Sequence, residues 1–148
     1  MAIAGHERPT VHAYMEKQIR RQRFATAQNG PALAFLVDWR AIERAARLVR
    51  LRIGDIDGNR YELLDPAAAV LEGRYPLAAV LLRRALIEFT LQKGRTTRYK
   101  HAARHVREID SLNAQIKDYA GFETHEQFTA RLLRTHSRKT GFWSLLRD

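Results

Sequence analysis

Residues 75–94 read YPLAAVLLRRALIEFTLQKG, and this stretch decides the fold class. Pro76 fits the first position of a helix, where no amide donor is needed, and Gly94 is a common helix end. Apolar side chains cover nearly the whole circumference of the helix between them. The residues expected on its only polar face are Arg83, Arg84, Glu88 and Gln92. Because a helix that is apolar nearly all round is buried, the sequence predicts a central helix with other helices packed around it.

Outside this stretch, apolar residues recur every three or four positions, and the alternation typical of strands is almost absent. The other predicted helices are 9–28, 32–53, 66–72, 98–118 and 124–136, followed by an apolar tail over 141–146 that docks onto the core. Asp65 is expected to cap the helix that starts at Pro66, and Thr124 with Gln127 has the spacing of a capping box. The pattern predicts an all-α protein of antiparallel helix pairs, stacked as a short solenoid or packed as an irregular bundle.

Length and composition limit the protein to a few classes. A chain of 148 residues is typical of one domain, and we expect a single helical domain over 1–148, with a basic helix or arm over 1–30 and a helical-repeat core over 31–148. The absence of cysteine excludes disulfides, thiolate zinc sites and a thiol nucleophile, and it fits a reducing compartment. There is no signal-peptide pattern and no apolar run of about 18 residues. We therefore expect a soluble, cytoplasmic protein that does not contact a membrane.

The chain is strongly basic, with 26 Lys and Arg against 16 Asp and Glu and a net charge of +10. Such an excess favours acidic partners, among them nucleic acid. Lys100, Arg104 and Arg107 follow a helical spacing and are expected to form one stripe, and a third cluster lies on the helix over 32–53. The candidate contacts for phosphate or an acidic partner are Lys100, Arg104, Arg107, Arg131, Arg134, Arg138 and Lys139. The alternative is that these cations only keep the outer helix faces in water.

No enzyme signature is found in the sequence. Serines are few and none stands in a nucleophile-elbow pattern, and there is no glycine-rich phosphate loop. His101 and His105 are four residues apart, a spacing that can bind a metal ion from one helix face. Position 102 is Ala where a zincin has Glu, and two ligands do not make a site. We expect no metal and no cofactor, and we interpret both histidines as hydrogen-bonded side chains between packed helices.

Several sequence blocks resemble those of an uncharacterised bacterial family, a domain of unknown function whose C-terminal region is thought to be tetratricopeptide-like. The matching blocks are Tyr61–Leu64, Tyr75–Ala79, Leu82–Ala85, Arg98–His105 and His136–Trp143. The resemblance implies a helical-repeat fold and supplies no catalytic residues. A related arrangement lies behind SWIM-type zinc fingers, whose cysteines are absent here. Members of the family are longer at the N-terminus, so the chain is expected to be a shortened relative or a fragment.

Two hypotheses of function follow. In the first, the protein is an interaction module that presents a groove between its helices to an acidic or helical protein partner. In the second, it is a nucleic-acid-associated protein whose Arg and Lys stripes contact the phosphate backbone. The two differ on the role of the cations, which are the binding site only in the second.

Overall fold

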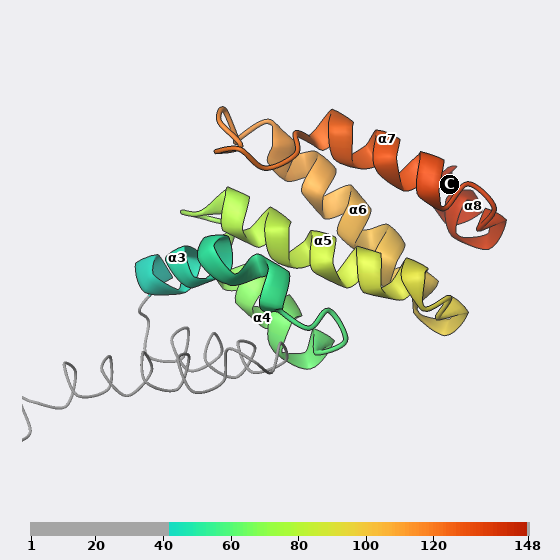
Figure 1. Cartoon of the computed structure of the whole chain (residues 1–148), viewed down its shortest axis with the longest axis horizontal. Coiled ribbons are helices and arrows are strands. Elements are labelled where there is room, and N and C mark those ends of the chain that lie inside the picture. Colours follow the sequence, from blue (N-terminus) through green and yellow to red (C-terminus); the bar gives the residue numbers. More distant parts are fainter. Residues whose placement is uncertain (1–41, 148) are drawn as a thin grey trace, which may run out of the picture.

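The structure, a computed structural model, describes residues 42–147, and every regular element in this range is helical (Figure 1). The α-helices are α3 (Ile42–Arg52), α4 (Tyr61–Leu71), α5 (Pro76–Gln92), α6 (Tyr99–Asn113), α7 (His125–Thr135) and α8 (Thr140–Arg147). Short 3-10 helices cover Ile53–Asp55 (η3) and Thr96–Arg98 (η4). The predicted all-α class is confirmed, whereas the helix predicted over 9–28 and the arm over 1–30 lie outside the described residues.

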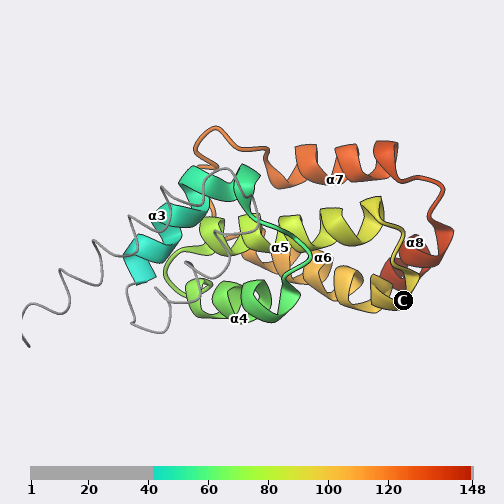
Figure 2. The ribbon, with the colours of Figure 1, turned by 60° about the horizontal axis from the view of Figure 1, so that its bottom comes forward.

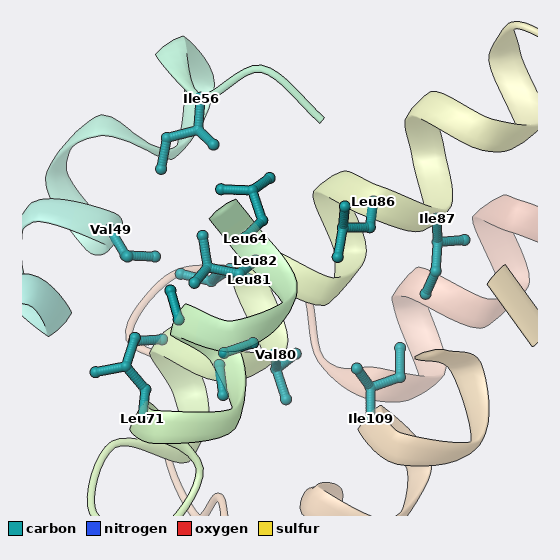
Figure 3. Packing of buried hydrophobic residues seen from close by; sticks show 14 of the residues in the cluster. Val49, Ile56, Leu64, Leu71, Val80, Leu81, Leu82, Leu86, Ile87 and Ile109 are labelled. Atoms are coloured by element: carbon teal, nitrogen blue, oxygen red, sulfur yellow. The ribbon is translucent and has the colours of Figure 1, made fainter. Parts of the chain in front are cut away.

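Helix α5 occupies the centre of this arrangement. It packs against α3, α4 and α6, while α8 packs against α6. Figure 2 shows α7 running along the opposite side of α5 from α4. Side chains from four helices meet in the core, among them Val49, Leu64, Leu82 and Ile109, which are all fully buried (Figure 3). The prediction of a central buried helix over this stretch is therefore confirmed.

The polar face predicted for α5 is wrong at two positions. Arg83 and Arg84 are only 2% and 7% exposed, because α4 and α6 cover the first and the aromatic rings of Tyr119 and Phe128 lie against the second. The expected helix ends are correct: Pro76 occupies the first turn, and Gly94 follows the helix with a φ of +60°, a conformation that glycine adopts without strain. Two arginines in the core are thus the main departure of this helix from the sequence pattern.

Helix α4 begins at Tyr61, five residues before the predicted start at Pro66. Asp65 therefore does not cap the helix, and its carboxylate binds arginine side chains of the two neighbouring helices. Pro66 lies inside α4 on an exposed position. Its missing amide leaves the Glu62 carbonyl without a helical partner, which an exposed first turn tolerates because water can bond it.

Helices α6, α7 and α8 form the C-terminal half of the described fold. Thr124 and Gln127 form the predicted capping box at the start of α7, while α6 ends at Asn113, five residues earlier than predicted. The predicted docking of the tail is confirmed, since Phe142 of α8 is fully buried against the Tyr99 ring of α6. None of the helices between residues 42 and 147 is long and apolar enough to span a bilayer.

Candidate functional site

A groove on the C-terminal half brings two of the predicted basic clusters together. Its cations are Lys100 from the first turn of α6 and Arg138 and Lys139 from the connection between α7 and α8. We call this the basic groove; it has a volume of about 470 Å³, and its other lining residues are Thr96, Tyr99, Thr140, Gly141 and Leu145. Lys100 and Arg138 are 38 residues apart in the sequence, and the packing of α8 on α6 brings them to one groove.

The cations of the basic groove are available to a ligand. Lys100 and Arg138 are exposed and Lys139 is half-buried. None of the three forms an ion pair with another residue in the range 42–147, and no Asp or Glu lines the groove. The groove therefore presents three positive charges without a local counter-charge, which favours an anion in solution.

The stripe predicted along α6 does not act as one surface. Arg104 pairs with Asp65 Oδ2 through its Nη2 atom at 3.1 Å and with Glu108 Oε2 through Nη1 at 3.2 Å. Arg107 donates a hydrogen bond to the carbonyl oxygen of Leu145 and so ties α6 to α8. Only Lys100 of the three keeps its charge free of a carboxylate or backbone partner among the described residues.

The second predicted cluster is also divided. Arg131 is held between two carboxylates, with 2.8 Å from its Nη2 atom to Glu88 Oε2 and 2.9 Å from Nε to Glu123 Oε2. These hydrogen bonds, that of Glu123 first, raise the pKa of Arg131 above its ordinary value. Arg134 lies exposed on α7. Arg138 and Lys139 therefore carry this cluster's contribution to the basic groove.

Arg83 is the centre of a buried ion cluster that joins α4, α5 and α6. Its Nη1 atom lies 2.9 Å from Asp65 Oδ1 and 3.0 Å from Glu108 Oε1, and its other nitrogens bind Glu72. The Nδ1 atom of His105 lies 3.2 Å from the same Nη1 atom. The guanidinium is nearly inaccessible, whereas the side chains of the three carboxylates keep about a third of their surface exposed. The cluster connects the three helices through ion pairs, as a structural ion cluster does.

The two histidines of α6 have different surroundings. The prediction that both lie between packed helices is correct for His105 and wrong for His101. His105 is buried and hydrogen-bonded between helices as predicted, but His101 is exposed. His101 lines a pocket of about 260 Å³ together with Asp65, Arg98 and His105. Arg83 lies against His105 Nδ1, which disfavours a cation there, and residues 42–147 contain no group of three side chains suited to a metal ion.

The comparisons with known proteins identify a family. The model of a family of unknown function (DUF6880) matches residues 12–145, which is most of the chain. The chain belongs to this family. The match confirms the expectation that the chain belongs to a family of unknown function. The matched range begins nearer to the N-terminus than Tyr61, where the first resembling block starts. Among curated proteins and among solved structures, no similar protein was found. A tetratricopeptide-like region in the family, and its relation to SWIM-type fingers, remain predictions.

In this member of the family, two buried histidines make stability depend on pH. Burial lowers the pKa of His105 below the ordinary 6.5 and outweighs the hydrogen bond to Glu108, which raises it; nearby Arg104 lowers the pKa and Asp65 raises it. Burial also lowers the pKa of His136, and Lys139 adds to this effect. The unfolded chain thus binds protons at a higher pH than the folded one. This contribution to stability is complete above about pH 6.5 and is lost as the pH falls toward the folded pKa values.

Urea unfolding at about pH 8 and about pH 5.5 is expected to show a lower free energy of unfolding at the acidic value. His105→Asn, which keeps a polar atom near Nδ1 but does not titrate, should reduce that difference. His101→Asn on the same helix is the matched control and should retain the wild-type difference. An undiminished difference in His105→Asn would show that the buried histidine does not carry the effect.

Arg83 and Arg84 are the buried charged residues that the sequence pattern missed. Asp65 and Glu72 are seven residues apart, a spacing that places two carboxylates on one face of a helix. Together with two arginines inside an apolar run, this spacing indicates a buried ion cluster. The spacing does not indicate which of the two arginines has carboxylate partners. The aromatic neighbours of Arg84 come from the chain after residue 118.

Proposed function

We propose that this protein is a binding module without catalytic activity and that it binds the phosphate backbone of nucleic acid through the basic groove. The observation that carries the proposal is the convergence of Lys100, Arg138 and Lys139 on one surface with no carboxylate among them. Lys100 is 38 residues away from Arg138 in the sequence, and a merely solvated charge would not need to be gathered in this way. The proposal therefore assigns phosphate contact to the basic groove and not to the stripe predicted along α6.

The chemistry of the groove suits a phosphate chain. Arg138 offers a planar fork of donors that can bind two phosphate oxygens, and the lysines add compact charges. Thr96 and Thr140 provide hydroxyl groups in the same lining. Contacts of this kind release counterions and do not depend on sequence. We expect binding that is salt-dependent and of low sequence specificity.

The test is fluorescence anisotropy of labelled duplex DNA and single-stranded RNA with the full chain, titrated with salt. If all three cations contact phosphates, the triple reversal of Lys100, Arg138 and Lys139 to Glu should reduce the slope of log affinity against log salt by about 3. Circular dichroism of the variant should match the wild type, since no described residue pairs with these side chains.

Helix α3 provides a matched control because Arg44, Arg47 and Arg50 are all exposed on it. In Figure 1, α3 and α8 lie at opposite ends of the described helices. Reversal of these three arginines to Glu changes the net charge equally and should leave most of the slope. An equal loss in both triple variants would assign binding to net charge alone, and absence of binding at physiological salt would contradict the proposal.

A protein-interaction module, with its helix pairs as a short tetratricopeptide-like repeat, is the second candidate. One observation favours it: a partly apolar groove beside α5 contains a buried arginine, Arg84, that forms no ion pair with a residue in the range 42–147. The two functions use different surfaces and can be tested separately.

A further inference from the structure

Arg84 is a buried cation with two side-chain nitrogen atoms that form no hydrogen bond with a described residue. The residue is 7% exposed, and its Nε and Nη2 atoms are buried with no hydrogen-bond partner among residues 42–147. It forms no ion pair with a residue in the range 42–147, in contrast to the adjacent Arg83. Buried polar groups are nearly always paired, so an unpartnered guanidinium needs an explanation.

The two unpartnered atoms form one edge of the guanidinium. The Nε and Nη2 hydrogens point the same way and match the two oxygens of a carboxylate, as in bidentate Arg–carboxylate pairs. The face of the guanidinium is already supported, with its Cζ atom 4.6 Å from the centre of the Phe128 ring and 5.4 Å from that of Tyr119. The aromatic rings support the face of the group, while its donor edge is buried and forms no hydrogen bond with a described residue.

Arg84 lines a groove of about 450 Å³ between η3, α5, α7 and the loop before α7, which we call the Arg84 groove. Its apolar lining includes Ile53, Leu81, Phe122 and Phe128. Figure 2 shows α7 running beside α5, with the loop before α7 at one end. A pocket of this size that combines apolar side chains with charged ones can bind a small group that is itself partly apolar and partly charged.

The charges around the groove restrict what can enter it. Glu88 and Glu123 line it but are both bound to Arg131, so these three side chains carry a net charge of −1. Adding Arg84 makes the groove neutral. One carboxylate can pair with Arg84, while the two glutamates would repel a dianionic phosphate. The suitable ligand therefore carries a single negative charge close to an apolar side chain.

We propose that the Arg84 groove binds the C-terminal carboxylate of a partner protein whose last residue is apolar. At a C-terminus the carboxylate and the apolar side chain are attached to the same carbon, so both fit a groove of this volume together. A small rotation of the guanidinium turns its unpartnered edge to the carboxylate, while the last side chain contacts Leu81 and Phe122. This peptide site goes beyond nucleic-acid binding and uses none of the cations of the basic groove.

The test uses N-acetyl-leucine as the probe, because it reproduces a peptide C-terminus with an apolar side chain. Titration into the isotope-labelled full chain should shift the Gly121 and Phe122 amide resonances and the Arg84 Nε–H resonance saturably. N-acetyl-leucinamide, which lacks the charge, should produce at most a small fraction of these shifts. Equal shifts with the amide, or none with the acid, would overturn the proposal.

A third ligand distinguishes a C-terminal carboxylate from the carboxylate of an internal acidic side chain. The α-amide of N-acetyl-glutamic acid presents its charge as an internal acidic side chain does. We expect this ligand to bind at least about tenfold more weakly than N-acetyl-leucine, since its carboxylate is not next to an apolar group. Binding of equal strength would overturn the assignment to a C-terminus.

Arg84→Met removes the charge and keeps an unbranched side chain over Phe128. A buried arginine without its ligand destabilises the folded state, so the melting temperature of this variant should be unchanged or higher. The resonance shifts that N-acetyl-leucine causes and its amide does not should disappear. Arg47→Met on α3 is the control and should bind as the wild type does. Retained binding in Arg84→Met would refute the site, and unchanged DNA affinity in this variant is expected because the two grooves are separate.

Discussion

Replacing Arg83 by methionine is expected to lower the free energy of unfolding by about 3 kcal/mol, at the lower end of the range for breaking a buried ion pair. The substitution leaves Asp65, Glu72 and Glu108 close together without the cation that joins them. Their side chains keep about a third of their surface in water, which reduces the cost below that of fully buried carboxylates. The loss should appear in urea unfolding as a lower midpoint with an unchanged slope.

The neighbouring residue supplies the control for this experiment. Arg84→Met changes the same side chain at the next position of α5, but it separates no ion pair among residues 42–147. We therefore expect its unfolding free energy to equal or exceed that of the wild type, since an unpaired buried charge opposes folding. A loss under about 1 kcal/mol for Arg83→Met would show that the buried ion cluster is not a main fastening of α4 and α6 to α5.

Local patterns predicted those features that depend on neighbours in the sequence. The start of α5 at Pro76, its end before Gly94 and the capping box at Thr124 follow from backbone chemistry within a few residues. The ion cluster does not, because the partners of Arg83 are 11 to 25 residues away on two other helices. A helical wheel places Arg83 on a polar face whether that face meets water or carboxylates.

The candidate site was predicted in its residues but not in its arrangement. The sequence indicates the cations, yet only tertiary contacts decide which of them are neutralised. Arg104 and Arg131 form ion pairs with carboxylates on other helices, whereas Lys100 forms none with a described residue. His101 and His105 differ for the same reason: positions four apart on a helix are close enough to share a face, yet only one of them lies under α4 and α5.

Phe142→Ala is expected to disrupt the basic groove without removing a charge. Phe142 is fully buried, and its ring lies edge-on to Tyr99 at 5.9 Å and to Trp143 at 4.9 Å between centroids. Truncation of such a phenylalanine costs about 3–5 kcal/mol. Because Tyr99 lines the groove and α8 supplies its other wall, loss of this contact should free α8 from α6 and separate Lys100 from Lys139.

Hydrogen exchange can distinguish this local release from general unfolding. The amides of α8 should lose protection in Phe142→Ala, while those of α4 and α5, which do not contact α8 closely, should keep most of theirs. Leu133→Ala, at an exposed position on α7, is the control and should stay within about 0.5 kcal/mol of the wild type. If the proposed function is correct, DNA affinity falls together with α8 protection. Affinity that survives the release of α8 would mean that the cations bind independently and that the groove does not organise them.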